Sequence, residues 1–156
     1  MLLKDKTAII HGAAGHLGRS IATTFAREGA KLFLAGRTFE PVLTLMKSLD
    51  ADAAQVDALD EMSAEEHAER VIDLAGRIDI GVNAVSIRGD LQGQPLIDMS
   101  VDDVLAPAET GIRTNFVTAR CCMQDDSQPR WCHPDAVFDI CGPFRSGPRL
   151  PPDGRI

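Results

Sequence analysis

Three glycines spaced three residues apart follow a short apolar run near the N-terminus, and this pattern can bind a phosphate. The run is TAIIH at residues 7–11, and the glycines are Gly12, Gly15 and Gly18. A glycine turn between a strand and a helix lets backbone N–H groups approach a pyrophosphate, and the helix N-terminus adds partial positive charge. Glycine turns also serve packing alone, so a structural role stays open. No Gly-Lys-Ser/Thr follows, which excludes the phosphate-binding loop of nucleoside triphosphatases.

The second position that bears on chemistry lies after the next apolar run, residues 31–35. The chain continues there with Gly36 and Arg37. An acidic side chain at this place binds the ribose 2′-hydroxyl of NAD, whereas the Arg37 guanidinium can pair with the 2′-phosphate of NADP. The alternative is a solvent-exposed arginine without a ligand. The sequence therefore favours NADP as the cofactor, with NAD as the second choice, and argues against a methyltransferase-type nucleotide site.

The elements that must position these residues alternate between strand and helix. Short apolar runs predict strands at 7–11, 31–35, 53–56 and 78–82. Helical spacing predicts helices over 17–26, 41–49, 63–75 and 100–123, the third opened by a capping box of Ser63 and Glu66, the last interrupted near Pro107 and Gly111. Since each parallel crossover needs a helix, this order predicts an α/β fold, a Rossmann-like doubly wound parallel sheet.

The last 33 residues, from Gln124, differ in character from the rest. They contain six of the nine prolines and the only tryptophan, with no lysine or glutamate, and they show no helical or alternating periodicity. Because proline interrupts both helices and strand ladders, such a segment does not continue a doubly wound fold. We therefore expect a dinucleotide-binding domain at residues 1–123, with an incomplete sheet, and an irregular tail at 124–156.

Composition excludes several classes of partner. A net charge of −7 and a pI near 5.0, without a basic patch, argue against nucleic acid and anionic membranes. The N-terminal apolar stretch is too short for a signal peptide, and no later run approaches the roughly 20 apolar residues of a membrane span, so we expect a cytoplasmic protein. The four cysteines, 121, 122, 132 and 141, have no zinc spacing. We expect thiols outside disulfides and no metal site.

Five short segments resemble, in the same order along the chain, the sequence motifs of the short-chain dehydrogenase/reductase family. The resemblance covers about residues 4 to 123. The segments are Gly12–Gly18, Gly36-Arg37, Val56-Asp57, Ile78–Ala84 and Asn115-Phe116.

The resemblance implies a role for each segment. The glycine turn would hold the cofactor pyrophosphate, which makes the residues from Gly12 to Gly18, with Gly15, His16 and Leu17, candidates for cofactor binding. Asp57 would bond the adenine amine, and Asn83 and Ala84 would lie beside the cofactor. Asn115 would help to order the catalytic proton relay. Each also has a plain structural interpretation, such as a strand-end cap for Asp57 or a solvent-facing helix position for Asn115.

The chain departs from the family pattern at several places. His11 replaces the usual threonine, His16 stands where many members have glycine, and Asn-Asn-Ala-Gly is reduced to Asn83-Ala84-Val85-Ser86. The two histidines can touch cofactor phosphates, but a histidine satisfied by local hydrogen bonds is the favoured interpretation.

The catalytic groups that the family uses are missing. Family catalysis rests on a tyrosine as acid or base, a lysine that lowers its pKa, and a serine that positions the carbonyl. This chain has no tyrosine, its last lysine is Lys47, and Ser127 and Ser146 stand in no recognisable context. A complete member would have about 100 more residues, by comparison with the full six-stranded sheet.

A frameshift is our hypothesis for the tail. Trp131–Gly142 (WCHPDAVFDICG), back-translated and read one nucleotide later, permits GVILTLSSTSAG, which resembles the family's fifth strand and its serine. Sequencing the encoding DNA tests this, since an early stop codon in the shifted frame would contradict it.

Three functional hypotheses follow. The first is an NADP-preferring oxidoreductase acting on a small carbonyl or alcohol, truncated and with little activity, and able to form homo-oligomers. The second is a dinucleotide-binding pseudoenzyme or sensor without catalysis. The third is a fragment that does not hold its fold, because an open sheet edge is exposed.

Overall fold

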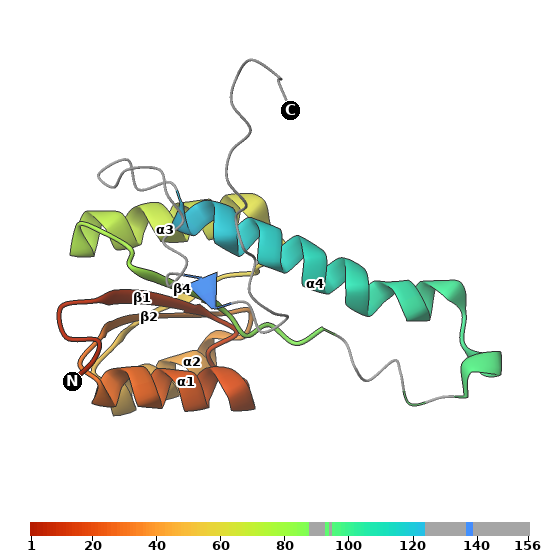
Figure 1. The fold of residues 1–156 in the computed structure, drawn as a ribbon, viewed down its shortest axis with the longest axis horizontal. Helices are drawn as coiled ribbons and strands as arrows, with labels where there is room; N and C mark the ends of the chain where they lie inside the picture. The colour runs from red at the N-terminus through yellow and green to blue at the C-terminus, as the bar shows by residue number, and fades with distance from the viewer. Residues whose placement is uncertain (88–92, 94, 124–136, 139–156) are drawn as a thin grey trace, which may run out of the picture.

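The computed structural model describes residues 1–87, 93, 95–123 and 137–138 (Figure 1). The strands are β1 (Thr7–His11), β2 (Lys31–Gly36), β3 (Asp52–Gln55), β4 (Ile80–Asn83) and β5 (Val137–Phe138). The helices are α1 (His16–Arg27), α2 (Phe39–Leu49), α3 (Glu61–Ala75), the 3₁₀ helix η2 (Leu96–Asp98) and α4 (Val101–Cys122).

The strands form one parallel sheet, in the order β3-β2-β1-β4-β5. Each of β2 and β4 pairs with β1, so that His11 lies beside Ala35 on one side and Asn83 on the other. Helices α1 and α2 cover one face of the sheet, while α3 and α4 cover the opposite face (Figure 1). The predicted Rossmann-like doubly wound sheet is confirmed.

Both faces of the central strands are buried, which explains why their sequences are continuous apolar runs. Ala8, Ile10 and Leu34 pack with the α1–α2 layer. Ile9 and Phe33, on the opposite face, pack with the α3–α4 layer. Because side chains alternate along β1, His11, which follows Ile10, points to the same side as Ile9, the α3–α4 side.

Helix α3 begins before the predicted capping box, so that prediction is wrong. Its N-cap is Asp60, whose carboxylate accepts hydrogen bonds from the N–H groups of Met62 and Ser63 at 3.1 and 3.4 Å. Aspartate is among the best N-caps, and once it caps the helix Ser63 lies inside the first turn. Strand β4 likewise begins at Ile80, two residues later than predicted.

Helix α4 runs unbroken through Pro107 and Gly111, where the sequence predicted an interruption. Tertiary contacts outweigh the poor helix propensity of these two residues. The Arg120 guanidinium bonds Glu61 and Glu65 of α3 at 2.8 and 2.7 Å, which ties the two helices together. Among the described residues, no helix is long and apolar enough to cross a membrane.

Two residues of the tail differ from the expected irregular structure. Val137–Phe138 form the short strand β5, which pairs in parallel with Gly81 and Val82 of β4. The outer edge of β4 is thus covered over part of its length. The rest of the predicted tail, with Cys132 and Cys141, lies outside the described residues; Cys121 and Cys122 are thiols outside disulfides, as expected.

Candidate functional site

The glycine turn between β1 and α1 is packed so closely that two of its positions have no room for a side chain. Gly12 has φ +72°, and a Cβ added there would lie 2.5 Å from the Ala84 carbonyl oxygen and 2.8 Å from the Val85 nitrogen. A Cβ on Gly18 would lie 2.3 Å from the Gly12 carbonyl oxygen. The turn therefore brings bare backbone to the carboxyl end of β1, beside the residues that follow β4.

The N-terminus of α1 has no side-chain cap and no acidic residue in its first turn. Gly15 is the N-cap, and the first helical hydrogen bond runs from the Arg19 N–H to the Gly15 carbonyl at 2.9 Å. The N–H groups of His16, Leu17 and Gly18 precede that bond and carry the positive end of the helix dipole. The side chains of His16 and Leu17, both candidates for cofactor binding, are exposed.

Arg37 directly follows β2, the strand that pairs with β1. Its side chain is exposed. Its carbonyl accepts a hydrogen bond from Gln55 Nε2 at 3.0 Å, which anchors the backbone while leaving the guanidinium at the surface. Asp57 follows β3 and accepts a bond from the Leu59 N–H at 3.0 Å. This local hydrogen bond agrees with the alternative interpretation of Asp57 as a cap at the end of a strand.

Asn83, at the end of β4, connects the sheet to the middle of α4. Its Nδ2 donates to Thr114 Oγ1 at 3.0 Å and to Asn115 Oδ1. Its Oδ1 accepts a bond from the Val85 N–H at 3.2 Å. The structure therefore brings Asn83, Ala84 and Asn115 together and places Ala84 against the glycine turn.

His11 and His67 form a second buried polar pair beneath the turn, between β1 and α3. Their rings meet edge to face, with centroids 6.1 Å apart. His11 Nδ1 and both ring nitrogens of His67 have no hydrogen-bond partner among the described residues. The interpretation of His11 as a histidine satisfied by local hydrogen bonds is thus wrong for this nitrogen, because the side chain points into an apolar layer.

Burial controls the charge of this pair. Burial, and then the neighbouring His67, lowers the pKa of His11 to about 3. Burial, followed by the positive charge of Arg70, lowers the pKa of His67 to about 4, against an opposing contribution from Asp52. Both imidazoles are therefore neutral near pH 7.

Sequence reasoning missed two residues of this region, Thr114 and His67. A signal existed for His67, because Ala64, Ala68 and Val71 place it on the buried face of α3 at helical spacing. Thr114 carried none, since its partner Asn83 is 31 residues away in the chain. Lys47 lies on α2, and Asn115 lies on α4, which covers the opposite face of the sheet (Figure 1).

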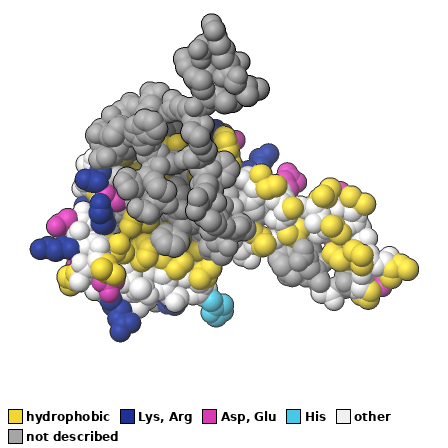
Figure 2. Space-filling view, in the orientation of Figure 1, with side chains coloured by type: hydrophobic (Ala, Val, Ile, Leu, Met, Phe, Trp, Pro, Cys, Tyr) yellow, Lys and Arg dark blue, Asp and Glu magenta, His cyan; other side chains and the backbone are white. Residues whose placement is uncertain are grey.

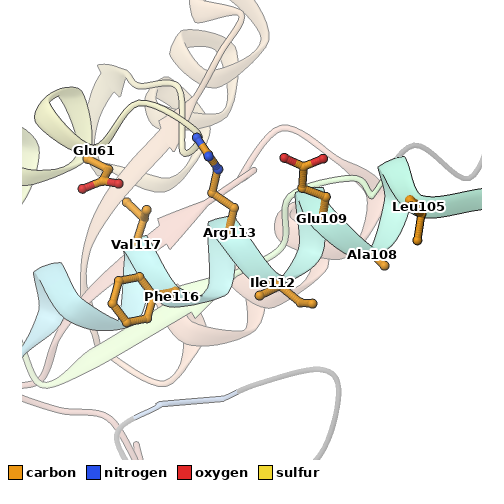
Figure 3. Close-up of a pocket in the computed structure, with 8 residues that line it drawn as sticks. All are labelled: Glu61, Leu105, Ala108, Glu109, Ile112, Arg113, Phe116 and Val117. Carbon is orange, nitrogen blue, oxygen red and sulfur yellow. The ribbon is translucent and has the colours of Figure 1, made fainter. Parts of the chain in front are cut away.

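A separate hollow of about 570 Å³ runs along α4, and no residue of the glycine turn lines it (Figure 3). Its lining combines apolar and charged side chains: Leu105, Ala108, Ile112, Phe116, Val117, Glu61, Glu109 and Arg113. Ile112 is 73% exposed and Phe116 is 61% exposed. Hydrophobic side chains also gather on the part of the molecule where η2 and the first turns of α4 extend past the sheet (Figure 2). This surface belongs to an exposed helix face rather than to the polar site.

Comparison with known proteins agrees with the fold and the motifs. Residues 6–128 match the family model described as short chain dehydrogenase. An uncharacterized oxidoreductase of Staphylococcus aureus strain USA300 is 30% identical over 126 residues, which are 78% of this chain and 53% of that protein. The chain thus spans about half the length of the curated relatives that it matches.

Solved structures of the same fold are also similar. A hydroxysteroid dehydrogenase from Escherichia coli is 26% identical, with a TM-score of 0.68, over 79% of this chain and 51% of its own. A short chain dehydrogenase from Burkholderia cenocepacia J2315, in complex with NADP, is 24% identical, with a TM-score of 0.67, over 78% of this chain and 51% of its own. With 123 of its 156 residues inside the family match, the chain belongs to the short-chain dehydrogenase family.

Proposed function

We propose that this chain binds NADP(H) at the glycine turn and is the cofactor-binding part of an oxidoreductase acting on a small carbonyl or alcohol. One observation carries the proposal: the glycines of the turn bring bare backbone to a helix N-terminus that has no side-chain cap among the described residues. Gly12 and Gly18 leave no room for a Cβ, and α1 supplies N–H groups and partial positive charge. These residues fit a pyrophosphate. The family assignment makes that pyrophosphate part of a dinucleotide.

The preference for NADP over NAD rests on Arg37. Its exposed guanidinium lies at the end of the strand next to β1, where the adenosine ribose would lie, and it can pair with a 2′-phosphate. Bound NADPH would supply a hydride for carbonyl reduction. His16, Leu17, Asp57, Asn83 and Ala84 would complete the binding surface, with Asn115 at the reacting end.

A binding module without catalysis is the second candidate. It is favoured by a specific observation: the sequence holds no tyrosine, and its last lysine, Lys47, lies across the sheet from Asn115. Without a tyrosine as proton donor, we expect little or no turnover from this chain. Saturable NADPH binding without hydride transfer to a panel of aldehydes and ketones would favour this candidate.

We also propose that copies of this chain pair through the exposed apolar face of α4. The hollow lined by Leu105, Ile112 and Phe116 supports this, because contiguous apolar surface of that kind commonly marks an interface. Glu109 and Arg113, which also line the hollow, would give complementary charges to two copies related by a two-fold axis.

The Arg37→Gln variant tests the cofactor preference. We expect Kd for NADPH to rise roughly tenfold, since a charge-assisted bond is lost, while Kd for NADH stays within about twofold. Titration followed by nicotinamide fluorescence measures both constants.

The matched control for this test is Arg27→Gln, which removes an exposed arginine from the last turn of α1, far from its N-terminus. It should leave both constants unchanged. If wild-type protein binds neither cofactor while unfolding cooperatively, the proposed function is wrong. If Arg37→Gln weakens NADH and NADPH equally, only the assignment of Arg37 to the 2′-phosphate is wrong.

A further inference from the structure

Thr114 is a fully buried hydroxyl in the middle of α4 that the cofactor motifs do not include. Its side chain is 0% exposed. Its Oγ1 donates a hydrogen bond to the Thr110 carbonyl at 2.8 Å and accepts one from Asn83 Nδ2 at 3.0 Å. A hydroxyl has one proton, so the bond to the helix carbonyl leaves its lone pairs for Asn83.

We propose that Thr114 is a positioning residue, whose hydroxyl fixes the Asn83 side chain and so holds residues 83–85 against the glycine turn. The effect on cofactor affinity rests on the function proposed above. The effect on the backbone of residues 83–85 is independent of that proposed function.

The orientation of the Asn83 amide follows from its partners. The Val85 N–H is a donor, so the Asn83 atom that faces it must be Oδ1, at 3.2 Å. Nδ2 then points toward α4, where both of its protons need acceptors. Thr114 Oγ1 supplies one and Asn115 Oδ1 the other. An apolar residue at position 114 would leave a part-buried N–H of Asn83 without its acceptor, which is unfavourable.

The segment that Asn83 orients is the wall of the glycine turn. The atoms nearest to a Cβ on Gly12 are the Ala84 carbonyl and the Val85 nitrogen. The Ala84 N–H also donates to the His11 carbonyl at 2.9 Å, directly before the turn. Release of the Asn83 side chain therefore frees the Val85 N–H and loosens the wall at its contact with Gly12.

Thr114→Val tests this, because it keeps the side-chain shape and removes the hydroxyl. We expect amide hydrogen exchange at Val85 to become roughly tenfold faster, the factor that corresponds to losing one side-chain hydrogen bond. Kd for NADPH should rise by a similar factor. Thr114→Ser keeps the hydroxyl and should stay within about twofold of wild type in both measurements.

The matched control is Thr118→Val, the same substitution one turn further along α4. Thr118 is also buried, but its hydroxyl donates to the helix carbonyls of Thr114 and Asn115. We expect no change in Val85 exchange. If Thr114→Val and Thr118→Val change Val85 exchange equally, the role of Thr114 is merely structural and the proposal is overturned.

A measurement on wild-type protein covers the case in which Thr114→Val does not fold. Asn83 and Asn115 are the only asparagines in the chain, so their side-chain amide signals are readily assigned by NMR. Slowed exchange of the Asn83 amide protons is expected, and exchange at the rate of a solvated amide would overturn the proposal. If wild-type protein does not bind NADPH, the proposed function fails, while Val85 exchange still decides the role of Thr114.

Discussion

We expect Gly12→Ala to abolish the proposed NADPH binding and to lower the free energy of unfolding by about 3 kcal/mol or more, whereas Gly76→Ala should lower it by only about 1 kcal/mol. The two glycines share a left-handed backbone, with φ +72° and +77°. They differ in what surrounds them. A Cβ at Gly12 meets the Ala84 carbonyl at 2.5 Å, and a Cβ at Gly76 meets nothing within 4 Å.

This pair separates backbone strain from close packing. At either position, the left-handed conformation of an alanine lowers the free energy of unfolding by roughly 1 to 2 kcal/mol. Only at Gly12 must the segment after β4 also move away, because a backbone atom occupies the space. The displaced segment opens the turn, and the N–H groups lose their arrangement around a pyrophosphate.

Chemical denaturation and NADPH titration of the two variants measure these effects. Gly76, at the end of α3, is remote from the turn, so Gly76→Ala should keep wild-type affinity. Equal losses of stability in the two variants would mean that the contact between Gly12 and Ala84 is looser than the structure shows. Wild-type affinity in Gly12→Ala would remove the turn from the cofactor site.

The second large effect is a loss of stability in mild acid that originates in His67. Its pKa is lowered from 6.5 to about 4, chiefly by burial, so the folded state binds its proton less readily than the unfolded state. The stability contributed by the neutral imidazole is fully present above pH 6.5 and is lost as the pH falls from 6.5 toward 4. A shift of this size corresponds to about 3 kcal/mol. His11, with a pKa of about 3, adds a loss over a wider range.

The charged surroundings of the pair do not compensate for this loss. Arg70 on α3 acts against protonation of His67, and His11 on β1 is itself buried and neutral. Asp52 on β3 favours the proton, but less strongly than burial opposes it. Across the same core, Arg120 of α4 is engaged with Glu61 and Glu65.

Comparison of His67→Leu with wild type isolates the contribution of His67. Denaturation between pH 7 and pH 4 should show wild type losing about 3 kcal/mol more than the variant. His16→Gln, which changes an exposed histidine on α1, serves as the control and should follow wild type. Parallel pH profiles for wild type and His67→Leu would contradict the assignment of a buried, neutral His67.

The sequence was a good guide to the fold because the fold depends on local patterns. Apolar runs, helical spacing and glycines locate every central strand to within two residues, since the chain at each place has one way to bury its apolar side chains. Prediction from the sequence failed where two local signals compete. Asp60 outcompetes Ser63 as the cap of α3, and α4 continues through Pro107, whose side chain is buried.

The site was predictable only in part, for a related reason. Gly12, Gly18 and Arg37 stand at ends of elements, so their positions follow from the order of strands and helices. The contacts of Asn83 with Thr114 and of His11 with His67 join residues 31 and more positions apart. Such pairs depend on the register and tilt of helices against the sheet, which the residue pattern of one segment does not contain.

The exposed apolar face of α4 bears on how the free energies of unfolding discussed above depend on protein concentration. If copies pair through Ile112 and Phe116, dimerisation adds to the stability of the folded state, and the unfolding midpoint rises with protein concentration. A dilution series then becomes a direct measure of subunit affinity. Ile112→Asp should make the midpoint independent of protein concentration, so that the stability of a single copy is measured without a contribution from pairing.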